Sequence, residues 1–137
     1  MIFLSQILVR VWFLTTDGYL VLRIKTVAWG FLILPFERRT SIETLNQTIR
    51  EIVERIKKFL PDNISLIFHE IGRRGHEINF LCHLPVDSDV FQRANFYLVS
   101  KKEFSRFKSK IPREDRLLFS RILGLQTDLS SFLEGAT

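Results

Sequence analysis

One change in hydrophobic period constrains the fold of this chain more than any other feature of its sequence. Between residues 40 and 60, apolar side chains recur every three or four positions: Ile42, Leu45, Ile49, Ile52, Val53, Ile56 and Phe59. This spacing puts them on one face of an α-helix. Thr40 and Glu43 have the spacing of a capping box, and Pro61 marks an end. The sequence therefore predicts a long helix over about residues 40–60.

The segments on either side of this helix have the pattern of short β-strands. Before it, β-branched, aromatic and other apolar residues dominate residues 6–14, 19–25 and 28–35, and Asp17-Gly18 predicts a hairpin turn between the first two. After it, we expect strands at residues 64–69, 77–84 and 95–99, with a turn at 72–75.

Two shorter helical segments are predicted over about residues 101–123. Ser100 and Glu103 form a second capping-box pattern, and Pro112 is suited to the first turn of the last helix. Leu117, Leu118, Ile122 and Leu123 should form the apolar side of that helix. The element order is neither an alternating βαβ repeat nor a helix bundle, so it predicts an α+β domain: a mixed sheet with the long helix on one face and the C-terminal helices on the other.

The length of 137 residues fits a single domain, with residues 124–137 expected to be a frayed acidic tail. Every uninterrupted apolar run falls short of the ~18 residues that a membrane-spanning helix needs, so we expect no membrane partner. One cysteine, Cys82, excludes an intramolecular disulfide and fits a reducing, cytoplasmic compartment. The 13 Phe residues exceed what one small core needs, and we therefore expect a homo-oligomer.

The positive charge of the chain is concentrated in one segment. Residues 101–121 contain eight Lys and Arg against three acids, which matches the net charge of +5 for the whole chain. The interleaved Phe104, Phe107 and Phe119 could help this segment to bind nucleic acid. Its contacts to phosphates would then be Lys101, Lys102, Arg106 and Lys108. These aromatics also lie at helical spacing, which favours two amphipathic helices with solvated basic faces.

Several segments together resemble the Nudix hydrolase family. Residues 19–25 (YLVLRIK) are similar to the family's hairpin strand, and residues 29–35 (WGFLILP) are similar to the approach to its signature. Residues 43–45 (ETL) and 49–54 (IREIVE) are similar to the signature helix, and residues 96–104 (FYLVSKKEF) are similar to the segment before the C-terminal helix. The resemblance covers about residues 6–123 and implies an α/β/α sandwich.

The signature itself is degenerate in this chain. Its glycines are replaced by Phe36 and Glu37. At the positions of its closing pair of acids stand Glu54 and, in place of the second acid, Arg55. The resemblance implies that Mg²⁺ would be held by several carboxylates on one helix face, for hydrolysis of a diphosphate. Glu51 and Glu54 remain as candidate catalytic and metal-binding residues. An arginine beside them disfavours Mg²⁺ and would pair with them instead.

We therefore expect a catalytically silent Nudix-like domain without a cofactor, acting as a binding module for a nucleotide, a nucleic acid or a protein. Arg38, Arg39, Arg73 and Arg74 lie in predicted loops and could hold phosphates, although the sequence slightly favours solvent-exposed loop charge. One alternative is a divergent Mg²⁺-dependent hydrolase of nucleoside diphosphate derivatives that uses Glu51 and Glu54. Another is a structural or self-associating interaction protein.

Overall fold

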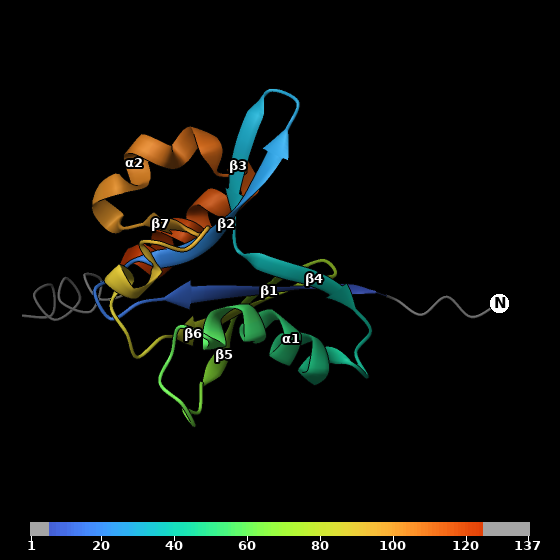
Figure 1. Cartoon of the computed structure of the whole chain (residues 1–137). Helices are drawn as coiled ribbons and strands as arrows, with labels where there is room; N and C mark the ends of the chain where they lie inside the picture. The colour runs from blue at the N-terminus through green and yellow to red at the C-terminus, as the bar shows by residue number, and fades with distance from the viewer. Residues whose placement is uncertain (1–5, 125–137) are drawn as a thin grey trace, which may run out of the picture.

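The computed structural model describes residues 6–124, and within them seven strands form one mixed sheet (Figure 1). The strands are β1 Ile7–Leu14, β2 Leu20–Val27, β3 Gly30–Leu34, β4 Phe36–Thr40, β5 Phe68–Arg74, β6 Glu77–His83 and β7 Tyr97–Val99. The helices are α1 Leu45–Lys57, the single-turn α2 Phe104–Phe107, and a last helical segment at residues 116–124. This arrangement confirms the α+β class and the mixed sheet.

Strand β1 lies at the centre of the sheet. One of its edges pairs with β6 in parallel, from Leu8 opposite Glu77 to Leu14 opposite His83. Its other edge is shared, because β4 pairs antiparallel with the first part of β1 and β2 pairs with Phe13 and Leu14. The sheet order is β3-β2-β1-β6-β5, with β4 added to β1 and β7 added to β2.

The two faces of the sheet carry separate apolar cores. Along β1, alternate side chains point to opposite faces. Val9, Val11 and Phe13 pack with Ile52, Val53 and Ile56 of α1. Trp12 and Leu14 pack on the other face, with Phe119, Ile122 and Leu123 of the last helical segment. Figure 1 shows α1 on one side of β1 and the C-terminal helices on the other. This arrangement of the helices confirms the prediction.

The long helix is shorter at its start than the sequence predicts. Thr40 is the last residue of β4, opposite Ile7, and α1 begins at Leu45. The predicted capping box is therefore wrong. The Thr40 hydroxyl lies 2.7 Å from the Thr44 hydroxyl and accepts a hydrogen bond from the Thr48 hydroxyl. Ile42 lies outside the helix and is 69% exposed. Strand pairing with β1 thus overrides the local capping pattern.

Other boundaries also differ from the predictions. Pro35 divides the predicted strand at 28–35 from the unpredicted β4. Strand β5 begins at Phe68 instead of residue 64 and continues through the predicted turn to Arg74. The hairpin turn is instead at residues 75–76, where Gly75 adopts a φ of +58°. The tail predicted from residue 124 lies almost wholly outside the described residues.

Helical predictions near the C-terminus are confirmed in part. The Ser100 hydroxyl donates to the Glu103 carboxylate at 3.0 Å and makes no capping bond to the backbone. The segment that follows is a 3₁₀ turn, Lys101–Glu103, before α2. In the last helix Leu117 is 74% exposed, whereas Phe119 is fully buried. Within residues 6–124, no helix has the length and apolar character needed to cross a bilayer.

Candidate functional site

Glu51 and Glu54 both lie on the exposed surface of α1, as their spacing predicts. Glu51 forms an ion pair with Arg38 of β4 and accepts a 3.4 Å hydrogen bond from the Gln47 amide. The predicted phosphate ligand Arg38 and the predicted metal ligand Glu51 therefore pair with each other. Among residues 6–124, no group of three or more His, Cys, Asp or Glu side chains is arranged to hold a metal ion.

The two arginine doublets do not form one site. Arg38 and Arg39 lie on β4 and Arg73 and Arg74 on β5, with β1 and β6 between those strands. All four are therefore on strands, not in the loops that we predicted. Arg73 forms an ion pair with Glu70.

Arg74 is held in place by the C-terminal region. Its guanidinium donates to the Glu114 carbonyl at 2.7 Å and to the Asp115 carboxylate at 3.2 Å. It also donates to Glu77 of β6 at 3.0 Å. Burial alone would lower the pKa of Arg74, but the hydrogen bonds that Arg74 donates to Asp115 and Glu77, together with the charges of these carboxylates, outweigh it and raise that pKa. Arg74 therefore stabilises the docking of the C-terminal segment.

The basic residues predicted after position 100 are divided between two places. Lys101 and Lys102 are exposed beside a cleft of about 340 Å³, which Asp17, Tyr19 and Leu123 also line. Arg106 and Lys108 are exposed on and after α2, where the Arg106 guanidinium lies 5.5 Å from the centre of the Phe107 ring. None of these four cations forms an ion pair with another described residue.

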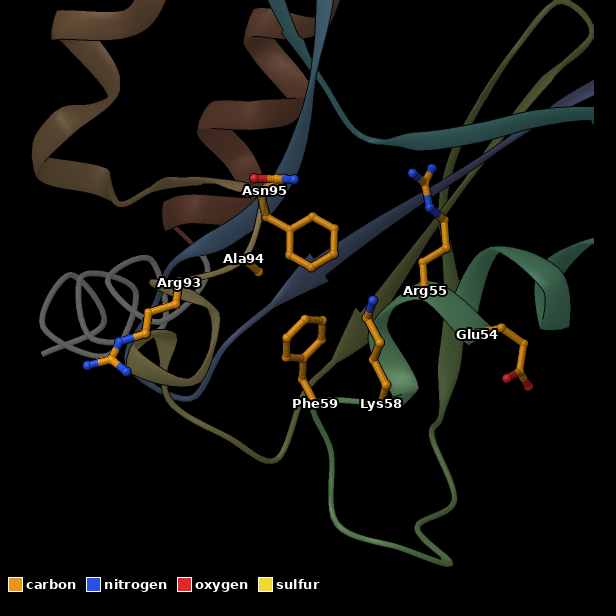
Figure 2. A pocket seen from close by; sticks show the side chains of 8 residues that line it. Glu54, Arg55, Lys58, Phe59, Arg93, Ala94 and Asn95 are labelled. Carbon is orange, nitrogen blue, oxygen red and sulfur yellow. The ribbon is translucent and has the colours of Figure 1, made fainter.

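A larger cleft lies between the end of α1 and the segment before β7. Its volume is about 590 Å³, within the range of small-molecule sites. Its lining comes from two segments: Glu54, Arg55, Lys58 and Phe59 from the helix end, and Arg93, Ala94, Asn95 and Phe96 from the other side. In Figure 2 the Arg55 and Lys58 side chains extend along the cleft, whereas the Glu54 carboxylate points away from it.

The floor of this cleft is aromatic. Phe59 and Phe96 meet edge to face with their ring centres 5.6 Å apart, and Phe96 meets Phe36 in the same way at 5.5 Å. The Arg55 guanidinium lies 5.6 Å from the centre of the Phe36 ring. The Lys58 ammonium lies 5.3 Å from the centre of the Phe59 ring. Cation–π attraction favours these positions of the two exposed cations over the rings.

A second, smaller cleft of about 120 Å³ adjoins the first and shares Arg55 with it. Arg23, Glu37 and Arg38 contribute its other charges. The Glu37 carboxylate is occupied, since it accepts hydrogen bonds from Arg23 at 2.8 Å and from Arg10 at 3.2 Å. Arg55 therefore stands at the junction of two clefts.

The sequence interpretation treated Arg55 as the residue that spoils a metal site, and Arg55 and Lys58 as ion-pair partners of the acids on the same helix. It gave neither of them, nor Arg93, a role in binding a ligand. Arg55 and Lys58 are three apart on α1, which puts them on one helix face. That part of the signal was present in the sequence. Arg93 lies on the far side of the cleft, and only the fold brings the 93–96 segment to the end of α1. The chain matches no protein-family model, and no curated protein matches it significantly.

Proposed function

We propose that this chain is a non-hydrolytic, Nudix-like binding domain that holds the phosphate groups of a nucleotide in the cleft at the end of α1. One observation carries the proposal: Arg55 and Lys58 extend along an aromatic-floored cleft from which the neighbouring carboxylate, Glu54, is turned away. Guanidinium and ammonium groups are the usual protein ligands of phosphate.

The aromatic floor suits the other half of a nucleotide. The half-buried Phe59 and Phe96 rings border the cleft, and rings of this kind can stack a base. The exposed Asn95 amide at the rim can donate to and accept from the edge of a base. A site with cations at one side and aromatic rings beneath fits a ligand that is both anionic and planar.

The positions where the chain departs from the Nudix signature support a binding role over a hydrolytic one. The first signature glycine is replaced by Phe36, whose ring contacts Phe96 and lies under Arg55. Arg55 stands where a signature carboxylate is expected, and Arg38 pairs with Glu51. One signature carboxylate is therefore replaced by a cation, and one of the two remaining acids is paired with a second cation.

Calorimetric titration with ATP, ADP and ADP-ribose, with and without Mg²⁺, tests this proposal when phosphate release is followed in the same samples. We expect binding that does not need Mg²⁺ and no turnover. The Arg55→Gln and Lys58→Gln variants should each weaken binding about tenfold or more, as expected for a lost charge-assisted hydrogen bond. Lys57→Gln removes the same charge from the adjacent exposed position, which does not line the cleft, and should have no effect.

Two results would contradict the proposal. Mg²⁺-dependent release of phosphate that Glu51→Gln abolishes would identify a divergent hydrolase. Equal weakening by Lys57→Gln and Lys58→Gln would mean that the nucleotide responds only to the general positive charge of the helix.

A further inference from the structure

A second cationic and aromatic surface lies on the opposite side of the sheet, where the β2–β3 hairpin meets α2. Figure 1 shows this hairpin extending beyond the rest of the sheet beside α2. Its two-residue turn, Ala28-Trp29, carries a tryptophan that is 68% exposed. A single exposed apolar side chain is ordinary on a protein surface, so the aromatic and cationic groups next to this turn carry the argument.

Side chains from three segments meet at Phe31, two residues after Trp29, and beyond it. The Lys110 ammonium lies 4.7 Å from the centre of the Phe31 ring, close to the Gly30 backbone. The Phe31 and Tyr97 ring centres are 6.1 Å apart, and those of Tyr97 and Phe107 are 5.2 Å apart. Arg106 lies over the Phe107 ring. We call this surface the hairpin strip; it consists of Trp29, Phe31, Tyr97, Arg106, Phe107 and Lys110.

The charge of the hairpin strip is positive. Arg106 and Lys110 form no ion pair with another described residue, and the exposed Lys108 lies between them in sequence. One acid lies near it, Glu103, whose carboxylate accepts a hydrogen bond from Ser100. Burial raises the pKa of the Tyr97 hydroxyl, so this ring adds no negative charge at neutral pH.

From this arrangement we infer that the hairpin strip binds single-stranded nucleic acid, with Arg106 and Lys110 on phosphates and Trp29 stacked on a base. Single strands expose unstacked bases, and an exposed indole offers them a stacking surface without sequence preference. A duplex keeps its bases stacked inside, so it could use the cations but not Trp29. This function is separate from that of the cleft at α1, which is on the other face of the sheet.

Titration with oligo(dT) and oligo(rU) of about 15 nucleotides tests the inference through tryptophan fluorescence and the anisotropy of a labelled strand. The chain has two tryptophans, and Trp12 is fully buried with its indole N–H bonded to Asn79, so Trp29 should supply the quenched emission. We expect quenching that disappears in Trp29→Phe, and affinity that falls steeply between about 50 and 200 mM salt.

Matched variants separate stacking from charge. Trp29→Ala should weaken binding about fivefold or more, whereas Ile42→Ala, at an equally exposed position before α1, should not change it. Arg106→Gln and Lys110→Gln should each weaken binding and reduce the salt slope by about 1. Lys57→Gln removes a charge on the far face of the sheet. It should leave both the oligonucleotide affinity and the salt slope unchanged.

The inference would be overturned by failure to bind either oligonucleotide at low salt. It would also be overturned if duplex bound as tightly as single strand and Trp29→Ala had no effect, because the surface would then be a general polyanion contact. The Arg55→Gln/Lys58→Gln double variant distinguishes the two proposals. It should lose nucleotide binding in the cleft and keep oligonucleotide binding on the hairpin strip.

Discussion

The guanidinium of Arg10 donates two hydrogen bonds of 2.7 Å each to the carboxylate of Asp115, 105 positions further along the chain. Both side chains are buried, at 2% and 5% exposed. Arg10 also lies 3.3 Å from Glu77 and 3.2 Å from Glu37. Burial alone would lower the pKa of Arg10, but the bonds and charge of Asp115 outweigh it and raise that pKa. Arg10 therefore remains charged inside the protein.

Removing the Asp115 charge should destabilise the fold strongly. Asp115→Asn leaves Arg10 buried without its bidentate partner, and breaking a buried ion pair typically costs about 3–5 kcal/mol. Urea denaturation measures this loss in the free energy of unfolding. Arg38→Gln breaks the exposed pair with Glu51 and should cost less than about 1 kcal/mol. Similar losses in the two variants would show that burial does not strengthen the Arg10–Asp115 pair.

Phe36 should be essential to the core even though the resemblance places a glycine there. Its ring is 2% exposed and packs edge to face with Phe13 and Phe96. Phe36→Ala should lower the free energy of unfolding by about 3–5 kcal/mol, because the cavity cannot fully collapse. Phe36→Leu fills most of that space and should cost less. Equal stability of wild type and Phe36→Ala would contradict this packing.

Cys82 should be unreactive in the folded protein. Burial raises the pKa of its thiol to about 12, and the thiolate is the reactive species. Iodoacetamide at neutral pH should therefore leave Cys82 unmodified in buffer and alkylate it in denaturing urea, which mass spectrometry can follow. Rapid alkylation without denaturant would indicate frequent opening of the sheet at β6.

His83 should make the fold less stable as the solution becomes mildly acidic. Partial desolvation of this exposed side chain, and then the neighbouring His69 whose ring centre lies 5.6 Å away, lower the pKa of His83 below its ordinary 6.5. Protonation therefore favours the unfolded chain, and the stability contribution is complete above pH 6.5 and lost as the pH falls toward the folded pKa. His83→Gln should flatten the dependence of the free energy of unfolding on pH in this range. An unchanged dependence in this variant would assign the effect to other groups.

The sequence predicts the helices and most strands because these depend on local periodicity. Within α1, Ile52, Val53 and Ile56 are buried, as their spacing indicates. The predicted start of the helix was wrong because Thr40 pairs with Ile7 in the sheet. No local sequence pattern indicates a pairing with a segment so distant in sequence. Pro35 marked a break in the sequence, but only the sheet shows that the chain continues beyond it as another strand.

The candidate site was less predictable than the fold. The charge of Arg55 was evident, but its position over Phe36 depends on β4 lying beneath α1. Arg10 interrupts an apolar strand, yet its partners come from β4, β6 and a 3₁₀ turn, Arg113–Asp115. Such contacts between distant segments require the tertiary arrangement, which periodicity does not contain.

The position of β1 has a consequence for how the chain folds during synthesis. This strand precedes its parallel partner β6 by more than half of the described chain, with β2, β3, β4, α1 and β5 between them. Until β6 has left the ribosome, one edge of β1 exposes unpaired backbone groups and strongly apolar side chains. Such long-range pairing slows folding. Nascent chains that stall before residue 83 should therefore depend on chaperones to avoid aggregation.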